Sequence, residues 1–297
     1  MTRSDYKNIL IEVASKKYGE EAGLQSKLNS IFFEKLAKAE GCDVHHCTGK
    51  DNSKGRPDFR SKSSHVLKFS SISDFVISKD SGQILAEIKR LTWVDPSREA
   101  FSGKGAKQLW DRCQKDEIEA IYEWCDKFHE DESKKGKTIP LNSATMPNVV
   151  SVVPDWYDSK KDQITHPAYD AGIMFTLTFN KGPEVKLYQL DSYLLDLYYG
   201  NCKYVIWTNG LVWKIFSIEN GTLKCEEFHP AKIHFDKNDY DYIPPLSKDD
   251  PSRIANPSEE VSKDASAYGE FVKQHIQIDQ NEFNALIDYL DSILSTL

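Results

Sequence analysis

The sequence predicts an α/β protein, because helical and strand-like patterns alternate along its 297 residues. Residues 73–77 and 84–89 are short and rich in β-branched and apolar side chains, and a turn-forming Lys-Asp-Ser-Gly segment separates them. A second pair of strands, rich in aromatic residues, flanks Asn209-Gly210, a strong signal for a hairpin. Elsewhere, apolar residues recur at the spacing of an amphipathic helix.

The same patterns divide the chain into elements and regions. Helices are expected over residues 4–18, 20–40, 106–128, 191–199 and 271–297. Strands are expected over residues 73–77, 84–89, 149–153, 173–179 and 185–190, followed by a meander over 203–228. We expect a core in residues 1–130, an insertion and the β-meander completing the same domain in 131–236, and a linker with a C-terminal helix in 237–297. The apolar stripe of that last helix favours packing on the core over a dimer contact.

Three polar residues interrupt the apolar pattern of the first two strands. Glu87 and Lys89 are two positions apart on one strand, so their side chains project from the same face. Asp74 begins the partner strand and is expected beside them. Two carboxylates and a backbone carbonyl are hard oxygen ligands that suit Mg²⁺, and a nearby lysine can orient a water or neutralise charge developing on a phosphate. The alternative is an ordinary solvated Glu–Lys pair on a strand surface.

At these residues the sequence resembles the PD-(D/E)XK nuclease superfamily, whose core carries Asp, a short gap and then Glu-x-Lys. The resemblance implies a restriction-endonuclease-like mixed sheet flanked by helices, and Mg²⁺-dependent hydrolysis of phosphodiesters, with Mn²⁺ as a substitute. Asp74, Glu87 and the Ile88 carbonyl would then hold the metal, and Lys89 would assist the attacking water. The Thr-Asn-Gly hairpin and following Trp213 are similar to a hairpin of the nuclease domain of type I restriction R subunits and their standalone relatives.

The resemblance implies two further site residues and leaves one alternative open. Many families of this superfamily place a glutamate on the first core helix, which makes Glu34 a candidate; otherwise it is a surface helix residue. The type I domains also carry Gln-x-x-x-Tyr on the helix after the Glu-x-Lys strand. Gln108 is the candidate glutamine, although Arg112 stands where that motif has tyrosine. Asp58, within a literal Pro-Asp, is an alternative to Asp74, which we favour because a short turn connects its strand to Glu87.

Charge is unevenly distributed along the chain. The formal net charge is −8, but residues 1–110 hold 19 Lys and Arg against 14 Asp and Glu, while the remaining residues have a net charge of −13. A basic region on an acidic body is typical of a protein that binds a polyanion through one face. The polar stretch 48–64, which includes Arg56 and Arg60, is the part of that region expected to contact phosphates, unless its charges only solubilise a loop.

Other classes of protein fit the sequence less well. No apolar run is long enough to cross a membrane and no signal-peptide pattern follows Met1, so we expect a cytoplasmic protein that does not bind membranes. Six scattered cysteines do not indicate a disulfide framework. Cys42-Asp43-Val44-His45-His46-Cys47 has two cysteines and two histidines, but no second close pair accompanies it, so zinc is disfavoured.

The sequence therefore predicts a metal-dependent endonuclease that acts on nucleic acid, DNA being the favoured substrate, in restriction or anti-phage defence. It would act alone, as a homodimer, or as the partner of another subunit of a defence system. The alternative is a non-catalytic protein that keeps a nuclease-like fold in order to bind nucleic acid or a partner.

Overall fold

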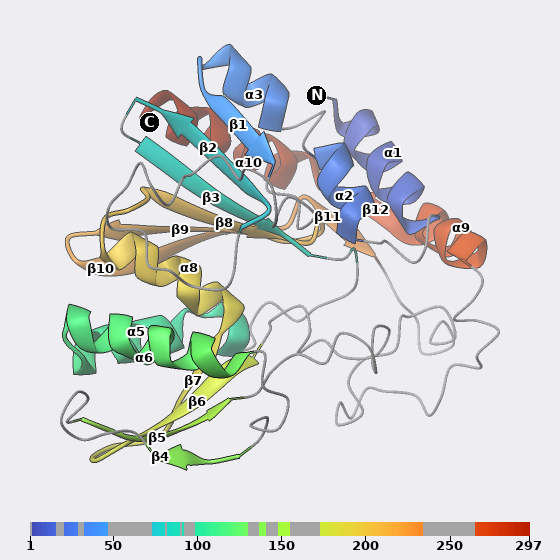
Figure 1. Cartoon of the computed structure of the whole chain (residues 1–297). Helices are drawn as coiled ribbons and strands as arrows, with labels where there is room; N and C mark the ends of the chain where they lie inside the picture. The colour runs from blue at the N-terminus through green and yellow to red at the C-terminus, as the bar shows by residue number, and fades with distance from the viewer. Residues whose placement is uncertain are drawn as a thin grey trace.

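A six-stranded mixed sheet occupies the centre of the computed structural model (Figure 1). Its strand order is β1-β2-β3-β8-β9-β10, and neighbouring strands are antiparallel except for the parallel pair β3 and β8. The strands are β1 (Asp43–His46), β2 (Phe75–Lys79), β3 (Gly82–Ile88), β8 (Tyr204–Thr208), β9 (Trp213–Glu219) and β10 (Thr222–Phe228). The predicted hairpins and meander therefore belong to one sheet, although more than a hundred residues separate β3 from β8 along the chain.

The structure describes residues 2–15, 21–28, 33–46, 73–80, 82–89, 91, 99–129, 137–140, 148–154, 173–233 and 265–297. The basic stretch 48–64, Cys47 and the alternative metal ligand Asp58 lie outside these residues. The predictions that rest on them stay predictions. Among the described residues, no helix is long and apolar enough to cross a membrane.

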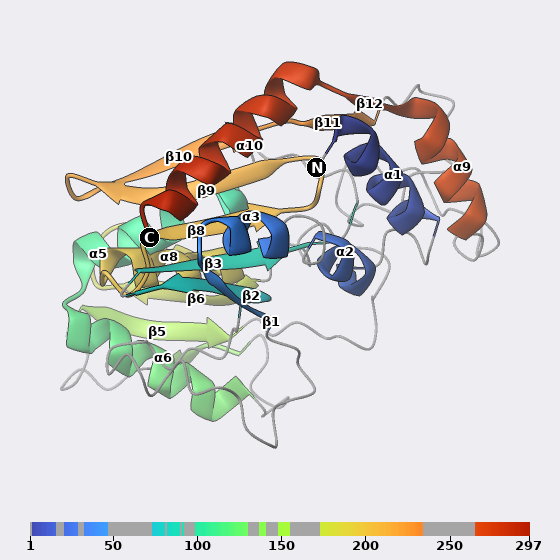
Figure 2. The ribbon, with the colours of Figure 1, turned by 90° about the horizontal axis from the view of Figure 1, so that it is seen from above.

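Helices cover both faces of the large sheet. On one side lie α2 (Glu21–Leu28), α3 (Glu34–Ala39) and α10 (Gln280–Ser295), and Figure 2 shows α10 crossing over β9 and β10. Beside them, α1 (Arg3–Ala14) packs against α9 (Ala265–His275) and the small sheet of β11 (Ala231–Ile233) and β12 (Ile276–Ile278). The opposite face of the large sheet is covered by α8 (Gln189–Tyr198), which contacts β8 and β9.

A second, antiparallel sheet lies beyond α8, with α5 (Lys104–Arg112) and α6 (Lys115–His129) between the two sheets (Figure 1). Its strands are β4 (Ile139–Pro140), β5 (Val149–Pro154), β6 (Ile173–Phe179) and β7 (Val185–Tyr188). Strand β7 runs directly into α8, so this sheet is connected to the helix that faces Glu87. A short 3-10 helix, η3 (Glu99–Phe101), precedes α5.

Three predicted helices differ from those observed. The expected helix over 106–128 is interrupted because Cys113 adopts an extended conformation and Glu117 accepts a hydrogen bond from the Gln114 N–H, which begins α6. The expected C-terminal helix is likewise divided, since β12 pairs with β11 between α9 and α10. Within 20–40, the structure describes the two helices α2 and α3. The buried apolar stripe of α10 packs on the core, as expected.

Two turns illustrate how local sequence fixes the sheet. The β9–β10 turn has Asn220 and Gly221 at φ 51° and 73°, the left-handed pair that a two-residue hairpin requires. The β8–β9 connection is longer than its Asn-Gly signal indicates, because Thr208 pairs with Trp213. There the Asn209 side-chain oxygen accepts hydrogen bonds from the N–H groups of Leu211 and Val212, which replaces part of the missing ladder.

Candidate functional site

The structure places Asp74 beside the Glu87-Ile88-Lys89 segment at the end of β3. Asp74 immediately precedes β2, whose Phe75 pairs with Ala86, and its Oδ2 accepts a hydrogen bond of 2.7 Å from the Ile88 N–H. In a strand the N–H and C=O of one residue project from the same edge. The Ile88 carbonyl therefore points toward the edge at which Asp74 lies, as a shared metal site would require.

Glu87 and Lys89 form an ion pair inside the protein and not on a solvated surface. The Lys89 Nζ lies 2.5 Å from Glu87 Oε1, and the two residues are only 6% and 3% exposed. Both side chains project toward α8, while Ile84, Ala86 and Ile88 are buried on the opposite face of β3. The alternative of an exposed Glu–Lys pair is therefore wrong.

Two residues of α8 complete a closed ring of hydrogen bonds with this pair. The Lys89 Nζ donates to Gln189 Oε1 at 2.8 Å, and the Gln189 Nε2 donates to the Tyr193 hydroxyl at 3.1 Å. The Tyr193 hydroxyl then donates to Glu87 Oε2 at 3.0 Å. We call these four residues the β3–α8 ring. Each atom has the role its chemistry allows: lysine only donates, the carboxylate only accepts, and the amide and the hydroxyl do both.

The charge state of Tyr193 agrees with its role as a donor. Burial raises the pKa of the Tyr193 hydroxyl well above its ordinary value, and the negative charges of Glu87 and then Asp74 raise it further. The hydroxyl therefore keeps its proton at neutral pH.

Sequence reasoning missed Gln189 and Tyr193, although the signal was present. They stand four apart on a helix, so they form a literal Gln-x-x-x-Tyr, the spacing expected of the motif that follows Glu-x-Lys. The sequence predicts that this helix starts at Asp191, but it begins at Gln189, because the Asp191 carboxylate accepts a hydrogen bond from the Tyr188 N–H as the third residue of the first turn. Asp191 also accepts a hydrogen bond from the Ala106 N–H, which ties α5 to α8.

The other two predicted site residues lie elsewhere or have other contacts. Gln108 is on α5, and the amide that contacts Lys89 belongs instead to Gln189. Glu34 is in the first turn of α3, where its side chain is 41% exposed and its carboxylate lies 3.4 Å from the Lys38 ammonium. The structure therefore brings together Asp74, Glu87, Ile88 and Lys89.

The donor atoms at this site suit a hard divalent cation. Within the described residues, no group of three or more His, Cys, Asp or Glu side chains gathers in a way that suits a metal ion. Asp74, Glu87 and the Ile88 carbonyl offer only oxygen, which is the donor that Mg²⁺ prefers while it keeps several waters. The set fits Mg²⁺ better than zinc, because it contains neither sulfur nor imidazole.

A second buried lysine lies on the same face of the sheet. The register places Glu87 opposite Trp207, Trp207 opposite Lys214, and Lys214 opposite Glu227. The Lys214 Nζ lies 3.2 Å from Glu227 Oε2 and donates to the Phe101 carbonyl. Lys214 thus resembles Lys89 in burial and charge, but two strand spacings, about 10 Å, separate it from Glu87, and Lys89 lies two residues further along the chain than Glu87.

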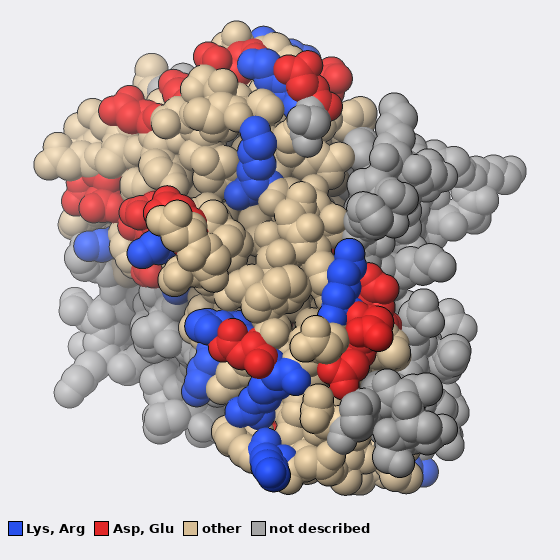
Figure 3. Space-filling model, turned by 90° about the vertical axis from the view of Figure 1, so that its left-hand side faces the viewer, with Lys and Arg blue, Asp and Glu red and all other residues tan. Residues whose placement is uncertain are grey.

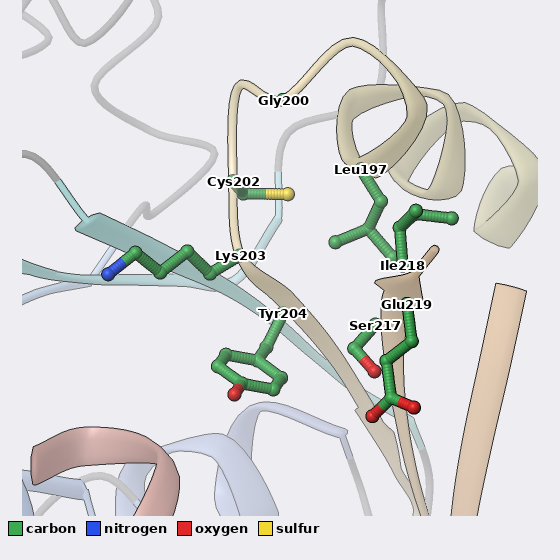
Figure 4. A pocket seen from close by; sticks show the side chains of 8 residues that line it. All are labelled: Leu197, Gly200, Cys202, Lys203, Tyr204, Ser217, Ile218 and Glu219. Carbon is green, nitrogen blue, oxygen red and sulfur yellow. The ribbon is translucent and has the colours of Figure 1, made fainter. Parts of the chain in front are cut away.

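A pocket of about 370 Å³ lies away from the β3–α8 ring (Figure 4). It opens beside Tyr204, at the opposite end of β8 from the Thr208 that pairs with Ile88. In Figure 4 the Lys203 side chain points away from the other lining residues. Burial raises the pKa of the Cys202 thiol in its wall well above its ordinary value, so this pocket offers no thiolate nucleophile.

On the face in Figure 3, the described Lys and Arg side chains lie among Asp and Glu side chains. The described part of this face therefore does not present the uniform positive field expected of a non-specific polyanion-binding surface. Comparisons with family models, with curated proteins and with solved structures found no match to this chain.

Proposed function

We propose that this protein is a Mg²⁺-dependent nuclease that hydrolyses phosphodiester bonds of nucleic acid, with DNA as the favoured substrate. The observation that supports this most is the convergence of Asp74, Glu87 and Lys89 at the end of β3, with Gln189 and Tyr193 beside them. The mixed pairing of β3, antiparallel to β2 and parallel to β8, suits a restriction-endonuclease-like core. A role in restriction or anti-phage defence follows from the resemblance alone.

Each residue of the site would have its own role in the reaction. Asp74, Glu87 and the Ile88 carbonyl would hold the metal ion, which when bound lowers the pKa of a coordinated water and screens the phosphate charge. Lys89 would place a positive charge where negative charge develops on the phosphate. Gln189 holds the Lys89 ammonium in position, and Tyr193 holds the Glu87 carboxylate. Such preorganised donors need no rearrangement during the reaction.

Single-turnover cleavage of duplex and single-stranded DNA in Mg²⁺ tests the proposal. Lys89→Met should lower the cleavage rate on the order of 10²–10³-fold. Lys214→Met is the matched control, since it removes another buried lysine from the same sheet face and should leave the rate nearly unchanged. If wild type cleaves no substrate in Mg²⁺ or Mn²⁺, the proposed activity is wrong. If the two lysine variants cleave equally well, Lys89 has no role in the chemistry.

A second pair of variants asks which glutamine belongs to the site. Gln189→Ala should slow cleavage, because it releases the Lys89 ammonium on one side. Gln108→Ala removes the same amide from α5 and should have little effect, because Gln108 does not belong to the ring. If Gln108→Ala slows cleavage and Gln189→Ala does not, the glutamine of the motif is Gln108.

One observation favours the second candidate function, a non-catalytic binding protein. The polar groups of the β3–α8 ring satisfy one another inside the protein, as a purely structural network would. Under this reading, DNA or a partner should bind without a divalent ion and without cleavage. Lys89→Met should then lower stability but leave the affinity of the folded protein unchanged.

A further inference from the structure

Among the described strands, β10 is an edge of the large sheet. It pairs with β9 on one side, and no strand among the described residues pairs with its other side (Figure 2). Its side chains are exposed on both faces from Lys224 to Glu227, whereas the first five residues of β9 are buried. An uncovered edge of this kind is a template for another strand.

The hairpin turn determines which backbone groups of β10 are available. Glu219 and Thr222 flank the two-residue turn and are directly paired, so Thr222 and then every second residue direct their N–H and C=O groups toward β9. Leu223, Cys225 and Glu227 therefore direct theirs outward. A strand that pairs with this edge must align its own outward-facing residues with these three.

The charges on β10 are complementary to a second copy of the same strand. If two β10 strands pair antiparallel about Cys225, Lys224 of each copy lies opposite Glu226 of the other. Pairing about Lys224 would place two lysines opposite each other, and pairing about Glu226 would do the same with two glutamates. Opposite charges stabilise a cross-strand pair and like charges destabilise it, so the charge pattern selects the register centred on Cys225.

We propose that two copies of this chain associate through β10, antiparallel and centred on Cys225, so that their two large sheets become one continuous sheet. The interface is isologous, because the same edge serves both copies. Since it consists mainly of one strand edge and two cross-strand ion pairs, the dimer is weak and depends on concentration. This inference does not depend on the proposed nuclease activity.

Sedimentation velocity of the full chain over a range of concentrations tests the dimer. Wild type should shift toward a dimer as its concentration rises, and Lys224→Glu, which places glutamate opposite glutamate, should weaken association at least tenfold. Glu226→Lys should do the same with lysines. The double variant Lys224→Glu/Glu226→Lys restores opposite charges and should restore the dimer. Both side chains are exposed, so the variants should fold like wild type, and circular dichroism checks this.

Oxidative cross-linking tests the register. In the proposed register, Cys225 of one copy forms a hydrogen-bonded antiparallel pair with Cys225 of the other. The Cα atoms of such a pair are about 5.5 Å apart, within the range that a disulfide spans. Cys225 is exposed, whereas Cys42, Cys113 and Cys202 are buried. Diamide, which accepts the two electrons and two protons that two thiols release, should give a disulfide-linked dimer that Cys225→Ser abolishes. Because desolvation by neighbouring groups raises the pKa of the Cys225 thiol to about 11, the reaction is run near pH 9 to increase the fraction of thiolate.

Each result of the sedimentation and cross-linking experiments either supports the β10 dimer or overturns it. A dimer that responds to the single reversals and returns in the double variant, with a cross-link at Cys225, supports the proposal. A chain that stays monomeric at its highest soluble concentration overturns it. So does a dimer that the reversals leave unchanged, or a cross-link that persists in Cys225→Ser, because each would place the contact elsewhere.

Discussion

Replacing Lys89 with methionine should destabilise the protein far more than the loss of a surface ion pair would. Lys89 and Glu87 are almost fully buried, and Lys89 donates to both Glu87 and Gln189. Methionine keeps most of the volume but leaves the Glu87 carboxylate buried with Tyr193 as its remaining partner in the ring. Removing one partner of a buried pair costs about 3–5 kcal/mol. That is a large share of the 5–15 kcal/mol or so by which folded domains are stable.

A double-mutant cycle separates the pair from its surroundings. Glu87→Gln/Lys89→Met removes both charges, so it should cost less than the sum of the two single variants, with a coupling of about 1–3 kcal/mol. Lys214→Met is the comparison. Its partner Glu227 is about one-third exposed and also contacts His229, so the carboxylate left behind stays solvated and the loss should be smaller.

Urea unfolding at pH 7, followed by tryptophan fluorescence, to which the buried Trp207 and Trp213 contribute, measures these free energies. The midpoint should fall for Lys89→Met while the slope of the transition stays unchanged. If Lys89→Met loses less than about 1 kcal/mol, the pair contributes no more than an exposed one. The reasoning from burial would then be refuted, and the rate loss expected of the same variant would need another explanation.

Asp74, Tyr193 and Gly105 each give one further prediction. Asp74→Asn should abolish the binding of Mg²⁺ or Mn²⁺ measured by calorimetry, whereas Asp43→Asn, an exposed aspartate on β1, should not; binding that survives in Asp74→Asn moves the site elsewhere. Because the pKa of Tyr193 is raised on folding, its stabilising contribution is complete below about pH 10 and declines as the pH rises toward the folded pKa. In Tyr193→Phe the free energy of unfolding should therefore fall less steeply above pH 10, by about 1.4 kcal/mol per pH unit, and parallel curves would contradict this. Gly105→Ala should lower the midpoint of thermal unfolding, since the new Cβ would lie 2.5 Å from Asp191 Oδ2; a loss of about 1–3 kcal/mol is expected, and an unchanged midpoint would contradict this.

Local sequence was sufficient to predict the part of the candidate site that lies on one hairpin. Asp74, Glu87 and Lys89 fall within sixteen consecutive residues, and the register of β2 and β3 follows from alternation and a short turn. The helix that faces them could not be assigned in the same way. The resemblance places a glutamine on the helix after the Glu-x-Lys strand, and in chain order that helix is α5, which carries Gln108. In the fold, α8 faces Glu87 and Lys89, and α5 packs behind α8. This arrangement results from tertiary packing, which a short stretch of sequence does not predict.

The errors in helix boundaries have a related physical origin. Helical periodicity continues across Cys113 and across residues 276–278, so the pattern gives no sign of an interruption. In the first case a side-chain cap from Glu117 begins a new helix, and in the second a strand pairing with β11 takes the backbone hydrogen bonds. The Glu117 cap and the β11–β12 pairing are each made by a few individual contacts, and the spacing of apolar residues does not reveal such contacts.

The position of the β3–α8 ring within the sheet bears on its stability and on the geometry that the proposed reaction would need. Polar side chains at the end of an otherwise apolar strand are costly unless every donor and acceptor is satisfied, and α8 supplies the missing partners at Gln189 and Tyr193. The same contacts fix the orientation of the Lys89 ammonium and the Glu87 carboxylate before any ligand arrives. Asp74 is only half-buried and bonds to the backbone at Ile88, so it is the carboxylate nearer to solvent. A ligand that approaches this end of β3 would therefore contact the accessible Asp74 carboxylate first, with the hydrogen-bonded β3–α8 ring behind it. The stability of the ring and the geometry of the site then depend on the same four side chains.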